Sequence, residues 1–337
     1  MKARIIFYGA LCALLMVGVW FYRMYSSKGS PQTKILSIAL PSQIVPPITG
    51  KPRLAPNPAN LQRGANPQQS GLRPFVDVIV DSQTSIDQRL AAIDSIKGRL
   101  TNADRESLYN FLRQESAADN GQLGQVLKNR LLDVLCALNP PASGLLDLLA
   151  EIYQDQGQNT VLRDYAVQHM VAYCQQLGSD ARLAQAQSEE LEHAKTLLWQ
   201  ALTETDSSIA GTALLGLDRL SQAGEPDADH TKISAVALKL AGDTDAGELS
   251  RITAFQVCAN LGLLDALPIV WDAAQNGATV PVQLSAIGAL GMLGGPDQIP
   301  FLNNLIQGNN NRLKLPAQHA LDQIKFRLKQ QAQAKTS

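Results

Sequence analysis

The sequence predicts an all-α protein: a right-handed α-solenoid of about six to seven helical hairpins, preceded by one transmembrane helix and a proline-rich linker. Three observations lead to this prediction. A short apolar triplet recurs at near-regular spacing, Ala and Leu dominate a chain with only 5% aromatic residues, and an uncharged run stands near the N-terminus. We therefore expect an anchor at residues 1–25, a flexible linker at residues 26–75 and a solenoid at residues 76–337.

The predicted anchor is residues 5–22, which read IIFYGALCALLMVGVWFY and hold 18 residues without a charge. This run meets the minimum length of a membrane span, and aromatic residues at both ends are typical of membrane interfaces. A cleaved signal peptide is the alternative, but the bulky residues Trp20 to Tyr25 offer no small-residue cleavage site. We expect a single-pass membrane protein with an extracytoplasmic body, periplasmic if the source is bacterial.

The predicted linker, residues 26–75, contains nine of the 17 prolines and no acidic residue. Such a composition favours an extended, flexible tether. Two apolar islands interrupt it between residues 35 and 45. They either dock on a surface or remain part of an unstructured tether, and the sequence leaves both interpretations open.

The body begins with Val76–Val80, a segment compatible with a strand or with a short helix. We predict a helix, because the first hairpin of a stack needs an N-terminal cover. Thr101 to Asp104 resembles a capping box, and Gly294-Gly295-Pro296 is a clear helix break. The further predicted helices are residues 85–98, 101–114, 120–138, 142–155, 159–177, 188–205, 207–222, 228–242, 248–262, 265–277, 280–294, 296–308 and 311–331.

The recurring triplet is clearest at Ala286, Leu290 and Leu293, which share one helix face. The other copies are Leu131/Leu135/Leu138, Ala166/Met170/Tyr173, Ala213/Leu217/Leu220, Ala254/Cys258/Leu261 and Ala317/Leu321/Ile324, with a partial copy at Ala92/Ile96. Successive copies lie 31 to 47 residues apart. Periods in this range are typical of stacked helical hairpins, in which each unit buries its apolar face against its neighbours.

A second repeated feature is a basic residue three positions before the triplet. It is present as Arg89, Lys128, Arg163, Arg251 and Lys314. The helix macrodipole favours acidic rather than basic residues near a helix start. The feature therefore indicates either a fixed contact between repeats or a solvated face.

The run Ala289-Leu290-Gly291-Met292-Leu293-Gly294, followed by Pro296-Asp297, resembles the bacterial HEAT-like repeat family. The resemblance implies an α-solenoid of helix pairs that serves as a binding scaffold in most members. It also implies a binding surface on the concave face, made from the second helices of the pairs. Some relatives are phycobilin lyases, but no lyase feature can be carried over to this sequence.

Charge is distributed unevenly along the chain. Residues 77–311 hold 29 acidic and 14 basic residues, a net charge of −15, whereas residues 1–76 hold nine basic residues and no acidic one. Nucleic-acid binding needs a basic surface, so no nucleic acid is expected as a partner. The basic N-terminal part either contacts anionic lipid or an acidic protein, or is a solvated tail.

The sequence contains no recognisable catalytic, cofactor-binding or metal-binding constellation, and we expect no enzyme activity and no cofactor. Glu190 and His193 form a single E-x-x-H pair, which predicts a solvated helix surface because di-iron sites need a second pair. Cys136, Cys174 and Cys258 are expected to be core thiols, with a Cys136–Cys174 disulfide as the alternative.

The favoured interpretation is a membrane-tethered helical-repeat scaffold that binds a protein partner of unknown identity. The alternatives are an enzyme or lyase-like chaperone with a site in the solenoid groove, and a purely structural envelope protein.

Overall fold

The computed structural model describes residues 72–96, 100–114, 121–138, 142–178, 184–185, 187–224 and 228–336. Every described residue belongs to one compact unit of the chain, Ala55–Ser337. The predicted anchor and the linker up to residue 71 lie outside the described residues. Within the described part, no helix has both the length and the apolar character that crossing a membrane requires.

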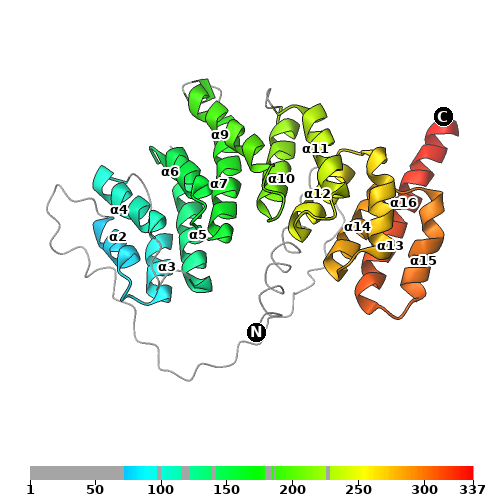
Figure 1. The fold of residues 1–337 in the computed structure, drawn as a ribbon, viewed down its shortest axis with the longest axis horizontal. Coiled ribbons are helices and arrows are strands. Elements are labelled where there is room, and N and C mark those ends of the chain that lie inside the picture. The colour runs from blue at the N-terminus through cyan, green and yellow to red at the C-terminus, as the bar shows by residue number, and fades with distance from the viewer. Residues whose placement is uncertain are drawn as a thin grey trace. The chain divides into compact units, whose positions relative to one another are not determined.

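The described residues form helices and turns and contain no strand, which confirms the all-α prediction for this part of the chain. Figure 1 shows the helices following one another in chain order. The α-helices are α2 (Arg73–Val80), α3 (Ile86–Asp94), α4 (Asn102–Arg113), α5 (Gln122–Ala137), α6 (Leu145–Gln154), α7 (Thr160–Gly178), α9 (Ser188–Ala201), α10 (Ile209–Gln222), α11 (His230–Gly242), α12 (Glu248–Asn260), α13 (Leu267–Asn276), α14 (Val280–Leu293), α15 (Ile299–Gln307) and α16 (Asn311–Thr336).

The helices are arranged in two layers. The first, which we call the triplet layer, consists of the helices that carry the apolar triplets, each packed against the next: α3, α5, α7, α10, α12, α14 and α16. The second layer consists of α2, α4, α6, α9, α11, α13 and α15, in which neighbours touch less extensively. Pairs with extensive contact, such as α13 with α14 and α15 with α16, join a second-layer helix to the triplet helix that follows it.

The triplets form the core of this arrangement, as predicted. The first two positions of every full copy are buried, and Ala92 and Ile96 of the partial copy are buried as well. Only Leu138 and Leu261 at the third position are half-buried, and each is the C-cap residue directly after the last residue of its helix. The repeated triplet therefore marks the contact between successive helices of one layer.

Small residues allow the triplet-layer helices to approach closely. A Cβ atom added at Gly216 of α10 would lie 2.2 Å from Cγ2 of Val171 on α7. One added at Gly291 of α14 would lie 3.0 Å from the Cα atom of Ala320 on α16. The second layer instead uses large side chains: the rings of Trp271 and Phe301, from α13 and α15, have centroids 5.1 Å apart.

Most predicted helix boundaries agree with the structure to within a few residues. Val76–Val80 lies in α2, a helix as predicted, and Thr101 and Asp104 form a reciprocal capping box at the start of α4. Three ends differ more: α3 ends at Asp94 rather than at residue 98, α9 ends at Ala201 rather than at residue 205, and α16 continues to Thr336 rather than ending at residue 331. The extension of α16 follows from good helix formers such as Gln, Ala and Lys after residue 331.

The repeated basic residue makes a fixed contact in the first three positions. Arg89 Nε donates to the carbonyl oxygen of Ile79 at 2.8 Å, Lys128 Nζ to that of Gln114 at 2.6 Å, and Arg163 Nε to that of Tyr153 at 2.7 Å. Each carbonyl lies at the C-terminal end of the preceding helix, where the macrodipole favours a cation. All three basic residues are buried, so the interpretation as a solvated face is wrong for them.

Candidate functional site

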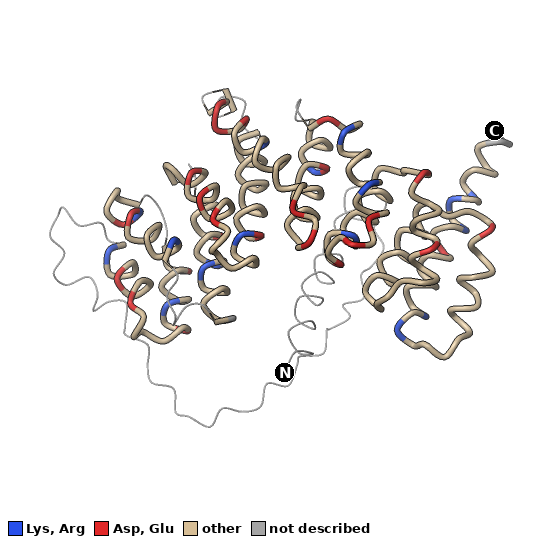
Figure 2. Tube along the Cα trace, viewed as in Figure 1, with Lys and Arg blue, Asp and Glu red and all other residues tan. Residues whose placement is uncertain are grey.

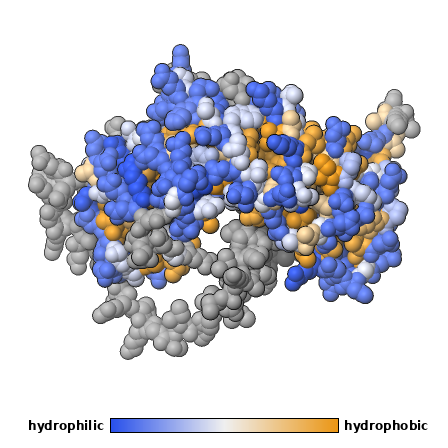
Figure 3. Space-filling model, viewed as in Figure 1, coloured by the Kyte–Doolittle hydropathy of each residue, from blue (hydrophilic) through white to orange (hydrophobic). Residues whose placement is uncertain are grey.

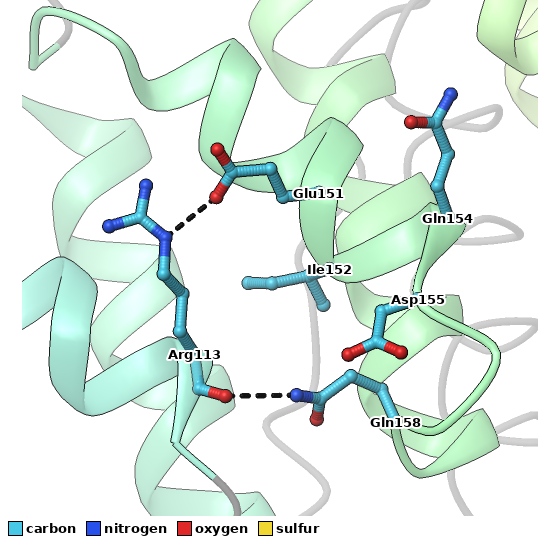
Figure 4. A pocket seen from close by; sticks show the side chains of 6 residues that line it. All are labelled: Arg113, Glu151, Ile152, Gln154, Asp155 and Gln158. Atoms are coloured by element: carbon cyan, nitrogen blue, oxygen red, sulfur yellow. Dashed lines mark hydrogen bonds and ion pairs between the residues drawn. The ribbon is translucent and has the colours of Figure 1, made fainter.

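A pocket of about 460 Å³ lies where the ends of several helices meet (Figure 4). It is bounded by the last residue of α4, the C-terminal turn of α6 and the loop that leads into α7. Its lining residues are Arg113, Glu151, Ile152, Gln154, Asp155 and Gln158.

Two polar contacts hold the pocket walls together. Arg113 Nε lies 2.6 Å from Oε2 of Glu151, and Gln158 Nε2 donates to the carbonyl oxygen of Arg113 at 3.0 Å (Figure 4). Ile152 is buried and contributes an apolar surface, whereas Asp155 is exposed and accepts a 2.9 Å hydrogen bond from the amide of Gly157. The pocket therefore has a fixed frame with an acidic rim, since the Arg113 guanidinium offsets only one of its two carboxylates.

Three exposed apolar side chains lie at the N-terminal turns of α5 and α7, two helices that pack side by side. Leu123 is 62% exposed, Val126 46% and Val161 48%. We call these three residues the edge patch. Val161 follows Gln158 of the pocket by three residues, which places it within about 10 Å of the pocket wall. Isolated exposed apolar residues are common, but several together on neighbouring helices typically mark an interaction site.

The wider surface around the pocket is acidic in character. Figure 2 shows acidic residues on α6 and further along the chain towards α12. Figure 3 shows apolar residues gathered mainly over the C-terminal half of the face in view, while hydrophilic residues cover most of the N-terminal half.

The histidines lie in no metal-binding cluster of the residues that the structure describes. His169 is buried between α5 and α7, with its Nε2 atom 3.2 Å from Oδ1 of Asn129 and 3.7 Å from Oδ1 of Asp133. Burial lowers the pKa of His169, and the nearby Asp133 carboxylate opposes that shift. Among the described residues, no cluster of three or more His, Cys, Asp or Glu side chains has the arrangement of a metal site.

The E-x-x-H pair of the sequence lies on the surface of α9, as predicted. His193 and Glu190 are both exposed, and Glu190 accepts a hydrogen bond from the hydroxyl of Tyr173 on α7. Glu190 therefore helps to join α7 to α9.

The three cysteines among the described residues, Cys136, Cys174 and Cys258, are buried free thiols, so the alternative of a Cys136–Cys174 disulfide is wrong. Burial raises the pKa of Cys136 and of Cys258 to about 12. Since the thiolate is the reactive form, these thiols are suited to packing rather than to nucleophilic chemistry.

Sequence reasoning missed two carboxylates in the triplet layer, the buried Asp218 and the half-buried Asp164. Asp218 of α10 is 1% exposed, and its Oδ2 atom accepts a 3.0 Å hydrogen bond from Gln222. Asp164 of α7 accepts a 2.8 Å hydrogen bond from the hydroxyl of Ser208. Burial raises the pKa of both carboxyls. An acidic residue inside an apolar helix pattern is the signal that would have indicated them.

Comparison with known proteins identifies no matching family model and no matching curated protein. A solved structure of human deoxyhypusine hydroxylase in complex with glycerol is similar over 76% of this chain and 96% of that chain, with 14% identity and a TM-score of 0.30. This finding contradicts our expectation that the chain is not an enzyme, because the similar protein is an enzyme, and we withdraw that expectation. At this TM-score the likeness carries no argument for hydroxylase activity here.

Proposed function

We propose that this protein is a membrane-tethered scaffold that binds a protein partner, with a body built as a right-handed, HEAT-like α-solenoid of about six to seven hairpins. The observation that carries the proposal is the edge patch beside the acid-rimmed pocket. Exposed Leu123, Val126 and Val161 provide apolar contact area, and the pocket supplies a fixed polar feature next to it. Interfaces commonly combine an apolar centre with a polar rim in this way.

The chemistry of the site indicates the kind of partner. An apolar stretch of the partner would cover the edge patch, and a lysine or arginine next to it would enter the pocket beside Glu151 and Asp155. The net charge of −15 over residues 77–311 favours encounter with a basic segment. A partner segment that is both apolar and basic fits these features best.

The membrane tether is supported by the uncharged run at residues 5–22. A linker of the length of residues 26–75 would reach about 40 Å as a coil and up to about 150 Å as an extended polyproline helix. We propose that the body lies outside the cytoplasm, in the periplasm if the source is bacterial. Such a linker would allow the body to reach partners over this range of distances from the membrane.

The test uses the detergent-solubilised full chain as bait, with retained proteins identified by mass spectrometry and then purified for direct binding. Leu123→Ser/Val126→Ser/Val161→Ser should weaken binding of the identified partner at least about tenfold, because it removes the apolar contact area. Leu264→Ser is the matched control, since Leu264 is 67% exposed but lies in the turn before α13. Equal binding by the triple variant and the control would contradict the proposed site.

A separate variant tests the pocket. Asp155→Lys reverses the charge of the exposed carboxylate at the rim. It should weaken the binding of a basic partner while leaving the fold unchanged. Unchanged affinity, or tighter binding, would show that the partner's basic residue does not enter the pocket.

A further inference from the structure

The outer face of α16 carries two of the most exposed apolar side chains of the described residues. Leu315 is 64% exposed and Phe326 is 63% exposed. The helix packs on α14 and α15 through its other sides, where Ala317, Leu321 and Ile324 are buried. Leu315 and Phe326 therefore face away from the body of the chain.

These two residues belong to one stripe along the helix. Leu315, His319, Asp322 and Phe326 are all exposed and are spaced by four, three and four residues. This spacing is that of the contact positions in a two-helix coiled coil. We call these four residues the α16 stripe.

The α16 stripe is self-complementary when it is reversed. An axis between Ala320 and Leu321 lies midway between Leu315 and Phe326, and also midway between His319 and Asp322. We propose that α16 pairs with α16 of a second copy of this chain, in antiparallel orientation, about a two-fold axis at this point. Leu315 then packs on Phe326 of the second copy, and His319 donates to the carboxylate of Asp322 of that copy.

The polar residues at the centre of the stripe favour the antiparallel orientation. Antiparallel pairing sets His319 opposite a carboxylate twice, since a two-fold contact repeats every interaction. Parallel pairing would set Asp322 opposite Asp322, a like-charge contact that is unfavourable. The antiparallel α16 helix of a second copy therefore matches both the apolar ends and the polar centre of the stripe.

Two basic residues at the ends of the stripe limit the strength of the contact. Arg312 and Lys329 continue the stripe at its two ends and would lie near each other across the pair, so the contact is confined to the four central residues. An interface of this size belongs to the small, weak class. We therefore expect a reversible dimer, which anchoring of both copies in one membrane would favour by raising their local concentration.

Cysteine pairing tests the geometry directly. In the full chain with Cys12→Ser, Leu315→Cys and Phe326→Cys are made separately, and oxidation should link the two variants only when they are mixed. Within a homogeneous sample the two cysteines would lie about 16 Å apart along the helix axes, too far for a disulfide. A disulfide in the Leu315→Cys sample alone, or none in the mixture, would overturn the proposal.

Affinity measurements test the chemistry. Sedimentation equilibrium of the full chain in detergent should show that Phe326→Asp raises the dimer dissociation constant roughly 100-fold, because the two-fold removes two apolar contacts at once. Leu264→Asp is the exposed control and should leave the constant unchanged. His319→Asp should weaken the dimer, and the reversed pair His319→Asp/Asp322→His should restore it. If the reversed pair did not restore the dimer dissociation constant, the proposed antiparallel register would be wrong. The dimer proposal does not depend on whether a partner binds the edge patch.

Discussion

The guanidinium of Arg163 connects the end of one helix to a turn two helices further along the chain. Its Nε atom donates to the carbonyl oxygen of Tyr153 at 2.7 Å, and its Nη2 atom lies 2.7 Å from Oε2 of Glu204. The Arg163 side chain is 6% exposed, and its guanidinium carbon lies 5.5 Å from the centre of the Tyr153 ring. One buried cation thus joins α6, α7 and the segment that follows α9.

Replacing Arg163 by Met should destabilise the chain by about 3–5 kcal/mol, because it leaves a helix-end carbonyl and a carboxylate without their partner. Arg130→Met is the matched control. Arg130 also pairs with a carboxylate, that of Asp94 at 2.8 Å, but both side chains are about half exposed. Such surface pairs are typically worth about 0–1 kcal/mol. Chemical denaturation of both variants measures the difference, and equal losses would mean that the burial of Arg163 has little energetic weight.

Two glycines inside helices should respond to alanine in opposite directions. At Gly216 a Cβ atom would lie 2.2 Å from Val171, so Gly216→Ala should cost about 1–3 kcal/mol through overpacking. At Gly288 in α14 a Cβ atom would meet no neighbouring atom within 4 Å, and Gly288→Ala should stabilise the helix by about 0.5–1 kcal/mol. Thermal unfolding of the two variants checks the signs. If Gly216→Ala were stabilising, the close approach of α7 and α10 would be wrong.

The buried carboxyl of Asp218 should make stability depend on pH. Burial raises the pKa of Asp218, while Gln222, Asn260, His230 and Arg219 favour its charged form less strongly. The folded chain therefore keeps this proton at pH values where the unfolded chain has lost it. The stability from this group is fully present below the ordinary carboxyl pKa and is lost as the pH rises through the raised value.

Asp218→Asn removes this titration, so the variant should unfold at a higher temperature than the wild type at pH 7–8. The gap should shrink as the pH is lowered through the raised pKa of Asp218, because the wild-type carboxyl then becomes protonated. Circular dichroism melting curves across this range provide the measurement, and Asp245→Asn, at an exposed position, is the control. A gap that stayed constant with pH would show that the carboxyl of Asp218 does not titrate in this range.

Periodicity and helix-breaking residues were sufficient to predict most of the fold. Ala286, Leu290 and Leu293 are buried in α14 as expected, because stacked helices leave one face of each helix no other place to pack. Helix ends were less predictable where no proline or glycine sets them. Asp94 ends α3 and Ala201 ends α9 without a helix-breaking residue at either position, so the contacts of the folded chain determine these ends.

The candidate site could be predicted only in part. The acidic net charge around the site is visible in the composition. The edge patch depends on which helix ends lie side by side, which the sequence does not show. In the sequence alone, Leu123, Val126 and Val161 are ordinary surface positions. The basic residue that precedes five of the seven triplet copies, with Ala210 and Gln283 at the other two, could likewise be predicted only in part. Spacing indicated that Arg163 had a repeated role, whereas its acceptor on Tyr153 depends on the fold.

The three buried thiols make the opening of individual helices observable without introducing new cysteines. Cys136, Cys174 and Cys258 sit in α5, α7 and α12, and an alkylating reagent reaches each of them only after its own region has opened. In a stack held together by neighbour contacts, those openings need not coincide. The relative modification rates of the three cysteines would then rank the local stability of successive parts of the chain, from one end of the stack towards the other.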